Sequence, residues 1–305
     1  MANLNSSYKE NRFDMVFYTK SLFQLMKPRV MSLVLFTSMV GLLIAPEKVS
    51  FTVSIISLFA VALGAGAAGA LNMWYESDLD ALMTRTCLRP IPTGRIKKKQ
   101  ALWFGIILST ISITLLYFVA NLISSVLLAT TIGFYFFIYT IWLKRRTPQN
   151  IVIGGAAGAL PPVIGWAIST NTVSLESIIL FLIIFIWTPS HFWALSLYKS
   201  SDYRKAKIPM LPITAGIGAT KINILIYSIV MAPIVALPYF FDFGSLIYLV
   251  LSSLMTLYYI YLCYLLLIEK NNKTSNIIAR KIFIYSIFYL FFIFVLILLD
   301  NLIQY

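Results

Sequence analysis

Charge is scarce in this 305-residue chain, and negative charge is scarcest: Asp and Glu number 11, against 24 Lys and Arg. There is one histidine and there are two cysteines. No continuous polar stretch is long enough for a separate soluble domain, and no segment shows the ten-residue alternation of a membrane β-barrel. Cys87 lies in a basic loop and Cys263 in an apolar run, so a structural disulfide is not expected.

Long apolar runs take up most of the chain, which is 60% hydrophobic. About 20 apolar residues cross a bilayer as a helix, and lipid leaves the backbone few other ways to satisfy its hydrogen bonds. The sequence therefore predicts an all-α fold, a single polytopic membrane domain over residues 1–305 with nine transmembrane helices. Their predicted ranges are 30–45, 52–73, 101–120, 122–142, 150–168, 175–197, 221–240, 245–268 and 281–299.

The basic residues fall on one side of these nine segments, since every Lys and Arg except Lys48 lies before the first helix or in alternate loops. Lys and Arg mark cytoplasmic loops. We therefore expect a cytoplasmic N-terminal tail (1–24), a periplasmic C-terminus and a bacterial inner membrane, with lipid rather than nucleic acid as the surrounding partner. The tail shows neither a secretory cleavage pattern nor the low acid content of a transit peptide.

Acidic residues cluster directly after the second helix, in "NMWYESDLDALMTRTCLRPIPTGR" from residue 72 to residue 95. Asn72, Glu76 and Asp80 are spaced i, i+4, i+8 and so share one helix stripe about 12 Å long. Asp78 lies roughly 200° round from Glu76 and joins them only if the helix unwinds. Amide and carboxylate oxygens suit Mg²⁺, and the lack of His and Cys argues against zinc. A solvated helix end with acids paired to Arg85 and Arg89 is the alternative.

A second long loop, residues 198–220, carries Asp202 followed by several bases in "YKSSDYRKAKIPMLP". Together with loop 77–99 it predicts two active-site loops that clamp a Mg²⁺-bridged diphosphate. An ordinary basic cytoplasmic loop is the alternative, and for the individual lysines it is the better one.

The segment "LKRRTPQNIVIGGAAGALPPVIGW" combines three bases, small residues and a double proline. The three bases either mark a cytoplasmic loop or bind an anion; they are Lys144, Arg145 and Arg146. Small residues favour close helix packing. A proline break at membrane depth is tolerated where the backbone is buried in protein or lines a cavity.

The single histidine, His191, lies in "WTPSHFW" near the cytoplasmic end of the sixth helix. A lone histidine on an apolar face is more often a hydrogen-bonded structural residue than a ligand. Ionisable residues within membrane helices nevertheless mark functional sites. If a haem needs a histidine ligand here, only His191 is available.

Four of these motifs in order, with "LMKPRVMSLVL" before them, resemble the UbiA-type intramembrane prenyltransferases, and within them the haem-farnesylating branch. The resemblance covers residues 25–220 by motif. It implies helices around a central cavity, a Mg²⁺ cofactor, and transfer of farnesyl from farnesyl diphosphate to the 2-vinyl group of haem b, giving haem O. It also implies haem A synthase or a terminal oxidase as downstream partners.

The resemblance also implies roles for individual residues. Asn72, Glu76, Asp78, Asp80 and Asp202 would hold metal, with Glu76, Asp80 and His191 catalytic. Diphosphate would be bound by Arg85, Arg89, Tyr139, Lys144 and Arg145.

Three positions depart from the family pattern. Glu76 stands where many members have Asp, the second loop has one acid, Asp202, where the aromatic-prenylating branch has several, and Lys207 replaces the usual Gly or Asn. Two rival functions stay open. One is prenylation of a quinone precursor, which His191 and "IPMLP" disfavour. The other is transport of an anionic lipid or metabolite, for which a site near the midplane is expected.

Overall fold

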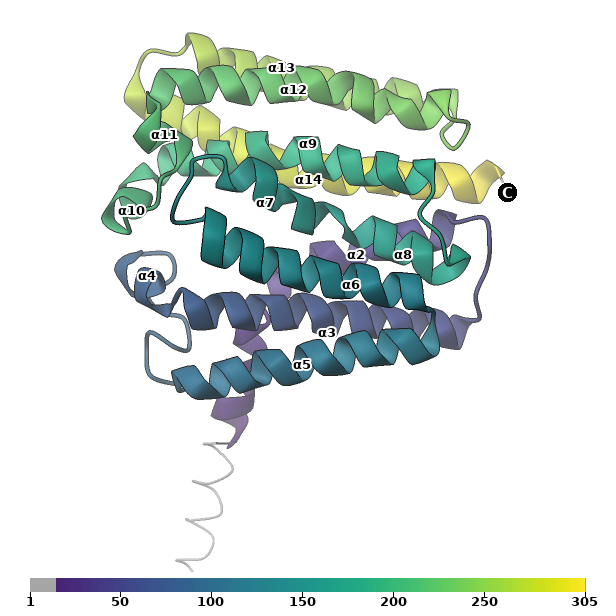
Figure 1. The fold of residues 1–305 in the computed structure, drawn as a ribbon. Helices are drawn as coiled ribbons and strands as arrows, with labels where there is room; N and C mark the ends of the chain where they lie inside the picture. Colours follow the sequence, from purple (N-terminus) through teal and green to yellow (C-terminus); the bar gives the residue numbers. More distant parts are fainter. Residues whose placement is uncertain (1–14, 305) are drawn as a thin grey trace, which may run out of the picture.

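The computed structural model describes residues 15–304, and within that range it contains helices and no strand (Figure 1). The tail residues 1–14 and Tyr305 lie outside the described residues. The long helices are α2 (Pro28–Ile44), α3 (Phe51–Tyr75), α5 (Lys98–Val119), α6 (Leu122–Gly133) continued by the π-helix η1 (Phe134–Leu143), α7 (Asn150–Ala159), α8 (Pro161–Thr170), α9 (Leu175–Tyr198), α12 (Gly216–Phe240), α13 (Leu246–Ile268) and α14 (Asn272–Gln304). Short helices α4 (Ser77–Leu82), α10 (Ser200–Lys205) and α11 (Leu211–Thr214) lie in the two long loops.

All nine predicted segments are helical, but residues 15–304 contain eight candidate membrane spans, or nine if a bent pair of helices counts as one span. Eight helical stretches are long and apolar enough to cross on their own. The first predicted helix, α2, has 17 residues and qualifies only together with the preceding helix Met15–Leu25, from which it is bent by 53°. The bend follows from the sequence "KP": Lys27 adopts a left-handed conformation (φ 54°), and Pro28, which has no N–H to donate, starts the new helix.

The predicted break at the double proline is present and lies in the middle of the molecule. Helix α7 ends at Ala159, and α8 begins at Pro161. Proline has no N–H, but the N–H of a first helical residue has no partner within the helix, so no hydrogen bond is lost there. Among the eight candidate spans of the described residues, Asn150–Thr170 and Leu175–Tyr198 are the most enclosed, since 67% of an 18-residue apolar stretch in each is buried. The broken helix is therefore surrounded by protein, which is the condition that lipid imposes on irregular backbone.

Helices α2 and α8 pack with almost no space between their backbones. A Cβ atom added to Gly165 would lie 1.8 Å from the carbonyl oxygen of Ser38. Small residues permit this close approach in membranes, where packing and not water exclusion holds helices together. Gly165, a small residue of the segment "LKRRTPQNIVIGGAAGALPPVIGW", therefore serves helix contact.

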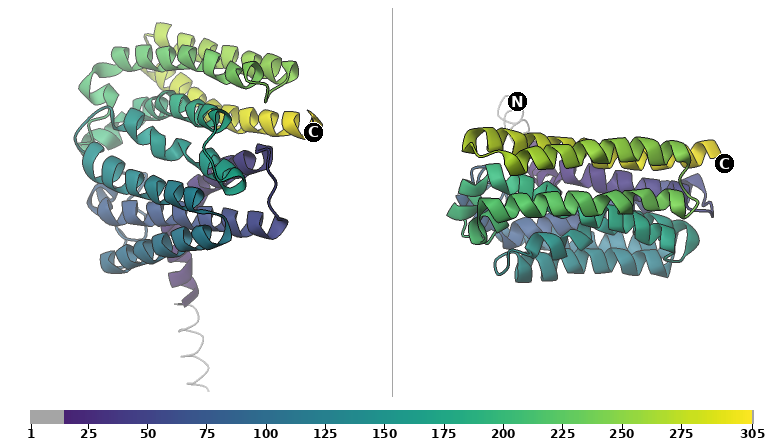
Figure 2. Two further views of the ribbon diagram at one scale, coloured as in Figure 1. Left: turned by 45° about the vertical axis from the view of Figure 1, so that its right-hand side comes forward. Right: turned by 90° about the horizontal axis from the view of Figure 1, so that it is seen from above.

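The two long loops meet at one end of the bundle, at the left in Figure 1, and the C-terminus lies at the other end (Figure 2). Helix α4 belongs to the first loop, and α10 and α11 belong to the second. An apolar cluster joins the loops to each other and to the start of α7. Its members are Leu79, Met83, Ile151, Tyr203, Ala206, Ile208 and Met210. Two regions more than 100 residues apart in sequence thus form one cap.

Candidate active site

The predicted stripe of Asn72, Glu76 and Asp80 is present, although helix α3 ends at Tyr75, in the middle of it. Glu76 forms the junction with α4, yet its N–H still donates to Asn72 O (2.9 Å), and the Asp80 N–H donates to Glu76 O (2.8 Å). The side chains of Asn72, Glu76 and Asp80 therefore keep one direction. Asn72 is 1% exposed, Glu76 2% and Asp80 3%.

Each of the two buried acids has a basic partner. Lys144 Nζ donates to Glu76 Oε2, and Arg89 Nη1 lies 2.8 Å from both carboxylate oxygens of Asp80. Burying an unpaired carboxylate is expensive, and leaving it near lipid is more so. In this structure the two bases offset that cost. The pairing of Arg89 with an acid is the one that the alternative to a metal site predicted.

Asp78 faces the other way, as its position round the helix predicts. Its side chain is 57% exposed, and Arg145 binds both of its oxygens, at 2.8 and 3.0 Å. Partial burial raises the pKa of Asp78, but the Arg145 hydrogen bonds and charge outweigh burial and hold this pKa below its ordinary value. The same bonds raise the pKa of Arg145. Asp78 is thus not brought together with the buried acids.

Lys27 belongs to this site and was missed in the sequence. Its Nζ donates to Asn72 Oδ1, Asn72 Nδ2 donates to Thr140 Oγ1 (3.1 Å), and Thr140 donates to the carbonyl of Tyr135 (2.8 Å). The left-handed backbone before Pro28 directs Lys27 into the bundle. The signal that was available is the "KP" pair at the start of the first helix.

The π-helix η1 positions two of the predicted anion ligands. The Lys144 N–H donates to Tyr139 O five residues earlier (3.0 Å), which is π-helical spacing and is common at functional sites. Lys144 Nζ lies 5.7 Å from the centre of the Tyr139 ring. That ring lies on Gly154 of α7, where a Cβ would be 2.2 Å from Tyr139 Cδ2. The glycine in "IGGAAG" therefore makes room for Tyr139.

The remaining predicted site residues of the loops are less tightly held. Arg85 is exposed and forms no ion pair with any described residue. Asp202, in the first turn of α10, is 6% exposed, and its carboxylate has no hydrogen-bond or ion-pair partner among residues 15–303. The apolar cluster of the cap brings its loop against the loop that carries Arg89.

The donor atoms fit a hard divalent cation, although the acids are not gathered around one point. Among the described residues, no three Asp, Glu, His or Cys side chains lie close enough together to hold one ion. However, Glu76 Oε1 is buried without any partner in the part of the chain that the structure describes. A buried carboxylate oxygen without a donor is uncommon and needs a reason. Together with Asn72 and Asp80 it offers oxygen ligands, which Mg²⁺ prefers.

His191 lies away from these charges, in the interior between α9 and α14. It is 7% exposed, and its Nδ1 lies 2.6 Å from Ser286 Oγ. The ring stacks between Trp187 (centroids 4.3 Å apart) and Phe283 (4.6 Å). The hydrogen bond matches the structural interpretation of this residue. The second ring nitrogen, Nε2, has no hydrogen-bond partner among the described residues.

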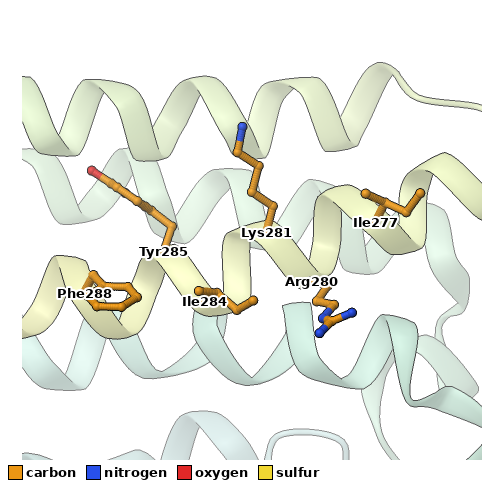
Figure 3. A pocket seen from close by; sticks show the side chains of 6 residues that line it. All are labelled: Ile277, Arg280, Lys281, Ile284, Tyr285 and Phe288. Carbon is orange, nitrogen blue, oxygen red and sulfur yellow. The ribbon is translucent and has the colours of Figure 1, made fainter.

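One surface groove lies away from this site. It has a volume of about 390 Å³ and follows one stripe of α14, as Figure 3 shows. Its walls are Ile277, Arg280, Lys281, Ile284, Tyr285 and Phe288. None of the predicted site residues lines it. The candidate site is therefore the charged set under the cap.

A helical bundle with up to nine spans, and with paired acids and bases under its cap loops, defines a polytopic membrane protein with a polar site at one membrane face. The chain belongs to the UbiA prenyltransferase family, which it matches over residues 34–298.

Relatives agree with this assignment. A protein from Pelagibacter ubique named "Protoheme IX farnesyltransferase" is 63% identical over 98% of this chain and 99% of its own length. One of the same name from Rhizobium rhizogenes is 50% identical over 92% of this chain and 88% of its own length.

Two solved structures share the fold. A digeranylgeranylglyceryl phosphate synthase matches with a TM-score of 0.77 at 19% identity, over 93% of this chain and 98% of that chain. A UbiA homologue from Archaeoglobus fulgidus bound to GPP and Mg²⁺ matches with a TM-score of 0.66 at 17% identity, over 91% and 99%.

Proposed function

We propose that this protein transfers the farnesyl group of farnesyl diphosphate to the 2-vinyl group of protohaem IX, giving haem O. The observation that carries the proposal is the buried pair Glu76 and Asp80, held by Lys144 and Arg89 at the edge of the membrane, with one oxygen of Glu76 left open. Relatives that carry the name of this activity are up to 63% identical over nearly the whole chain.

The acids and bases under the cap form a binding site for the diphosphate. Lys144 and Arg89 are already at the mouth of the site, and the exposed Arg85 is free to turn toward an anion. The Tyr139 ring lies 5.7 Å from Lys144 Nζ, and Arg145, the next residue in the chain, binds Asp78. Basic groups arranged before the reaction stabilise the negative charge that develops on the leaving diphosphate. Lys27 adds a further positive charge through Asn72.

The oxygen donors of the site would hold Mg²⁺: Asn72, Glu76 and Asp80, with Asp202 from the second loop, while Asp78, which is exposed and bound by Arg145, is left out of this set. When bound, Mg²⁺ supplies Lewis-acid neutralisation of the diphosphate oxygens. When Glu76 and Asp80 bind the metal, their partners Lys144 and Arg89 become available to bind the diphosphate.

The reaction breaks the allylic C–O bond and forms one C–C bond. Loss of diphosphate leaves an allylic cation, and the apolar interior keeps water from it. The terminal carbon of the porphyrin vinyl group attacks, and the resulting porphyrin-side cation takes up water and loses a proton, giving a hydroxyethylfarnesyl group. In this proposal His191, in the enclosed helix α9, either binds the haem iron or positions the water that captures the cation.

The orientation follows from the basic loops. We propose an inner-membrane location with the cap and the N-terminal tail in the cytoplasm and the C-terminus in the periplasm. The single-domain organisation, with 77–99 and 198–220 as active-site loops, remains our prediction. A haem A synthase or terminal oxidase would receive the product.

Mass spectrometry of extracted haem tests the proposal. Membranes that contain this protein, supplied with haem b and farnesyl diphosphate, should yield a haem heavier by one farnesyl group and one hydroxyl group. Replacing haem b with 4-hydroxybenzoate tests the quinone-precursor alternative, and diphosphate release separates both transferases from a transporter. Prenylation of 4-hydroxybenzoate with no haem product would refute the proposed acceptor.

A further inference from the structure

His191 and Ser286 connect α9 to α14 in the buried interior. His191 Nδ1 lies 2.6 Å from Ser286 Oγ, and one turn earlier Trp187 Nε1 donates to the backbone oxygen of the same serine (2.8 Å). Ser286 is fully buried, and His191 is nearly so. One position on α14 therefore determines where the only imidazole of the chain is held.

The hydrogen bonds of Ser286 decide which ring nitrogen carries the proton. Its hydroxyl donates to the carbonyl of Phe283, at 2.7 Å. A hydroxyl has one proton to donate, and a carbonyl can only accept. With its hydrogen on the Phe283 carbonyl, the Ser286 oxygen accepts from His191, and this arrangement places the imidazole hydrogen on Nδ1. Since no carboxylate contacts the ring among the described residues, the imidazole is neutral and Nε2 holds a lone pair.

Two aromatic rings fix the plane in which this lone pair lies. Trp187 stacks on one side, with 20° between the planes, and Phe283 stacks on the other, with 25°. The imidazole therefore cannot flip without displacing both rings. Nε2 has no hydrogen-bond partner within residues 15–303, and the histidine as a whole is 7% exposed.

We infer that Ser286 is a positioning residue that holds His191 in the Nδ1–H form, so that Nε2 binds the iron of the porphyrin substrate. This inference rests on the proposed function, because it takes haem as the acceptor. A metal-bound histidine almost always donates its other ring N–H to a second residue, which fixes the tautomer. Neutral imidazole is an established ligand of haem iron.

The position of His191 along α9 suits this role. It precedes the end of the helix, Tyr198, by seven residues, which is about 10 Å along the axis. Iron held there would place the porphyrin on the membrane side of the cap that carries the diphosphate site. Ser286 thus helps to fix the position of the haem acceptor, while Glu76 and Asp80 fix the position of the farnesyl diphosphate donor.

Haem titration of the purified protein tests the inference. The wild type should show the absorption spectrum of imidazole-ligated haem, and His191→Ala should lose it and regain it with added imidazole. Ser286→Ala should weaken haem affinity by about 10- to 100-fold, and Ser286→Thr, which keeps the hydroxyl, should stay near the wild type. Ser196→Ala is the matched control, since Ser196 is equally buried and its hydroxyl donates only to Trp193 O.

A measurement on the unaltered protein covers the case in which Ser286→Ala does not fold. With one histidine in the chain, ¹⁵N-histidine labelling of untagged protein gives a single ring whose nitrogen shifts report the tautomer. Nδ1–H is expected, and Nε2–H would overturn the inference. Unchanged affinity and spectrum in Ser286→Ala would also overturn it. Farnesylated haem formed without imidazole ligation would refute the inference alone, whereas absence of that product would refute the proposed function.

Discussion

Lys144, the residue that follows the π-helix η1, donates a hydrogen bond to one carboxylate oxygen of Glu76 and leaves the other, Oε1, buried with no partner in the described structure. The carboxylate is thus neutralised in charge but not saturated in hydrogen bonding. A group in this state is ready to accept a cation from the open side. We regard this half-satisfied pair as the centre of the site.

Asp80 and Asp78 should respond very differently to the same substitution. Asp80→Asn removes a buried charge that faces the site, so the rate of haem farnesylation should fall by about 10²- to 10³-fold, the usual effect of losing one preorganised electrostatic group. Asp78→Asn, at an exposed pair two residues away, should stay within a few-fold of the wild type. Initial rates in membranes with equal protein content check this. Equal losses in both variants would contradict the separation of the two acids.

The Lys144–Glu76 pair predicts a rescue of stability without a rescue of activity. Lys144→Met leaves Glu76 as an unpaired buried charge, which typically costs about 3–5 kcal/mol. Adding Glu76→Gln removes that charge, so the double variant should recover most of the melting temperature in detergent but no farnesylation. Arg146→Met, at an exposed neighbour without an ion pair in the described structure, is the control and should change neither. Recovery of activity in the double variant would show that the pair is only structural.

The close contact between α2 and α8 predicts strong sensitivity to one methyl group. Gly165→Ala places a Cβ against the Ser38 carbonyl, and such overpacking costs about 1–3 kcal/mol or more. Gly158→Ala, three residues before Pro161, meets no described atom within 4 Å and should be neutral or slightly stabilising, because Ala favours helix. Thermal unfolding of both variants in one detergent tests the contrast. A melting temperature of Gly165→Ala equal to that of the wild type would be incompatible with the described packing.

The Asp78–Arg145 pair predicts a small loss of stability in acid. Because the pKa of Asp78 is lower in the folded state, the pair stabilises the fold above the ordinary Asp pKa, near 3.8, and this contribution disappears as pH falls through the folded value. The pair is exposed, so the effect should be no more than about 1 kcal/mol. Asp78→Asn should remove this part of the pH dependence when melting temperatures at pH 6 and pH 3 are compared. An unchanged pH profile in Asp78→Asn would contradict the lowered pKa of Asp78.

The helices and the charged stripe could be predicted from the sequence because each follows from a local rule. Lipid requires helices wherever the apolar run is long enough. The i, i+4, i+8 spacing of Asn72, Glu76 and Asp80 places their side chains on one stripe, even though α3 ends within it. The proline break before α8 was predictable for the same reason.

Other features depend on contacts between distant segments and could not be predicted. The contact of Lys144 with Glu76, the contact of Lys27 with Asn72 and the contact of Ser286 with His191 each join residues 45 or more positions apart. The extra helix Met15–Leu25 before α2 was assigned to a tail because its length alone does not cross a bilayer. Periodicity reports a face of a helix, but it does not say which partner that face meets.

A crystal structure with Mn²⁺ and a non-hydrolysable farnesyl diphosphate analogue tests the central claim most directly. Anomalous scattering should place a metal ion at Glu76 Oε1 and Asp80, with the diphosphate beside it and with Lys144 and Arg89 turned from the acids to the phosphate oxygens. Acids still bound to Lys144 and Arg89, with no ion beside them and the analogue elsewhere, would contradict it.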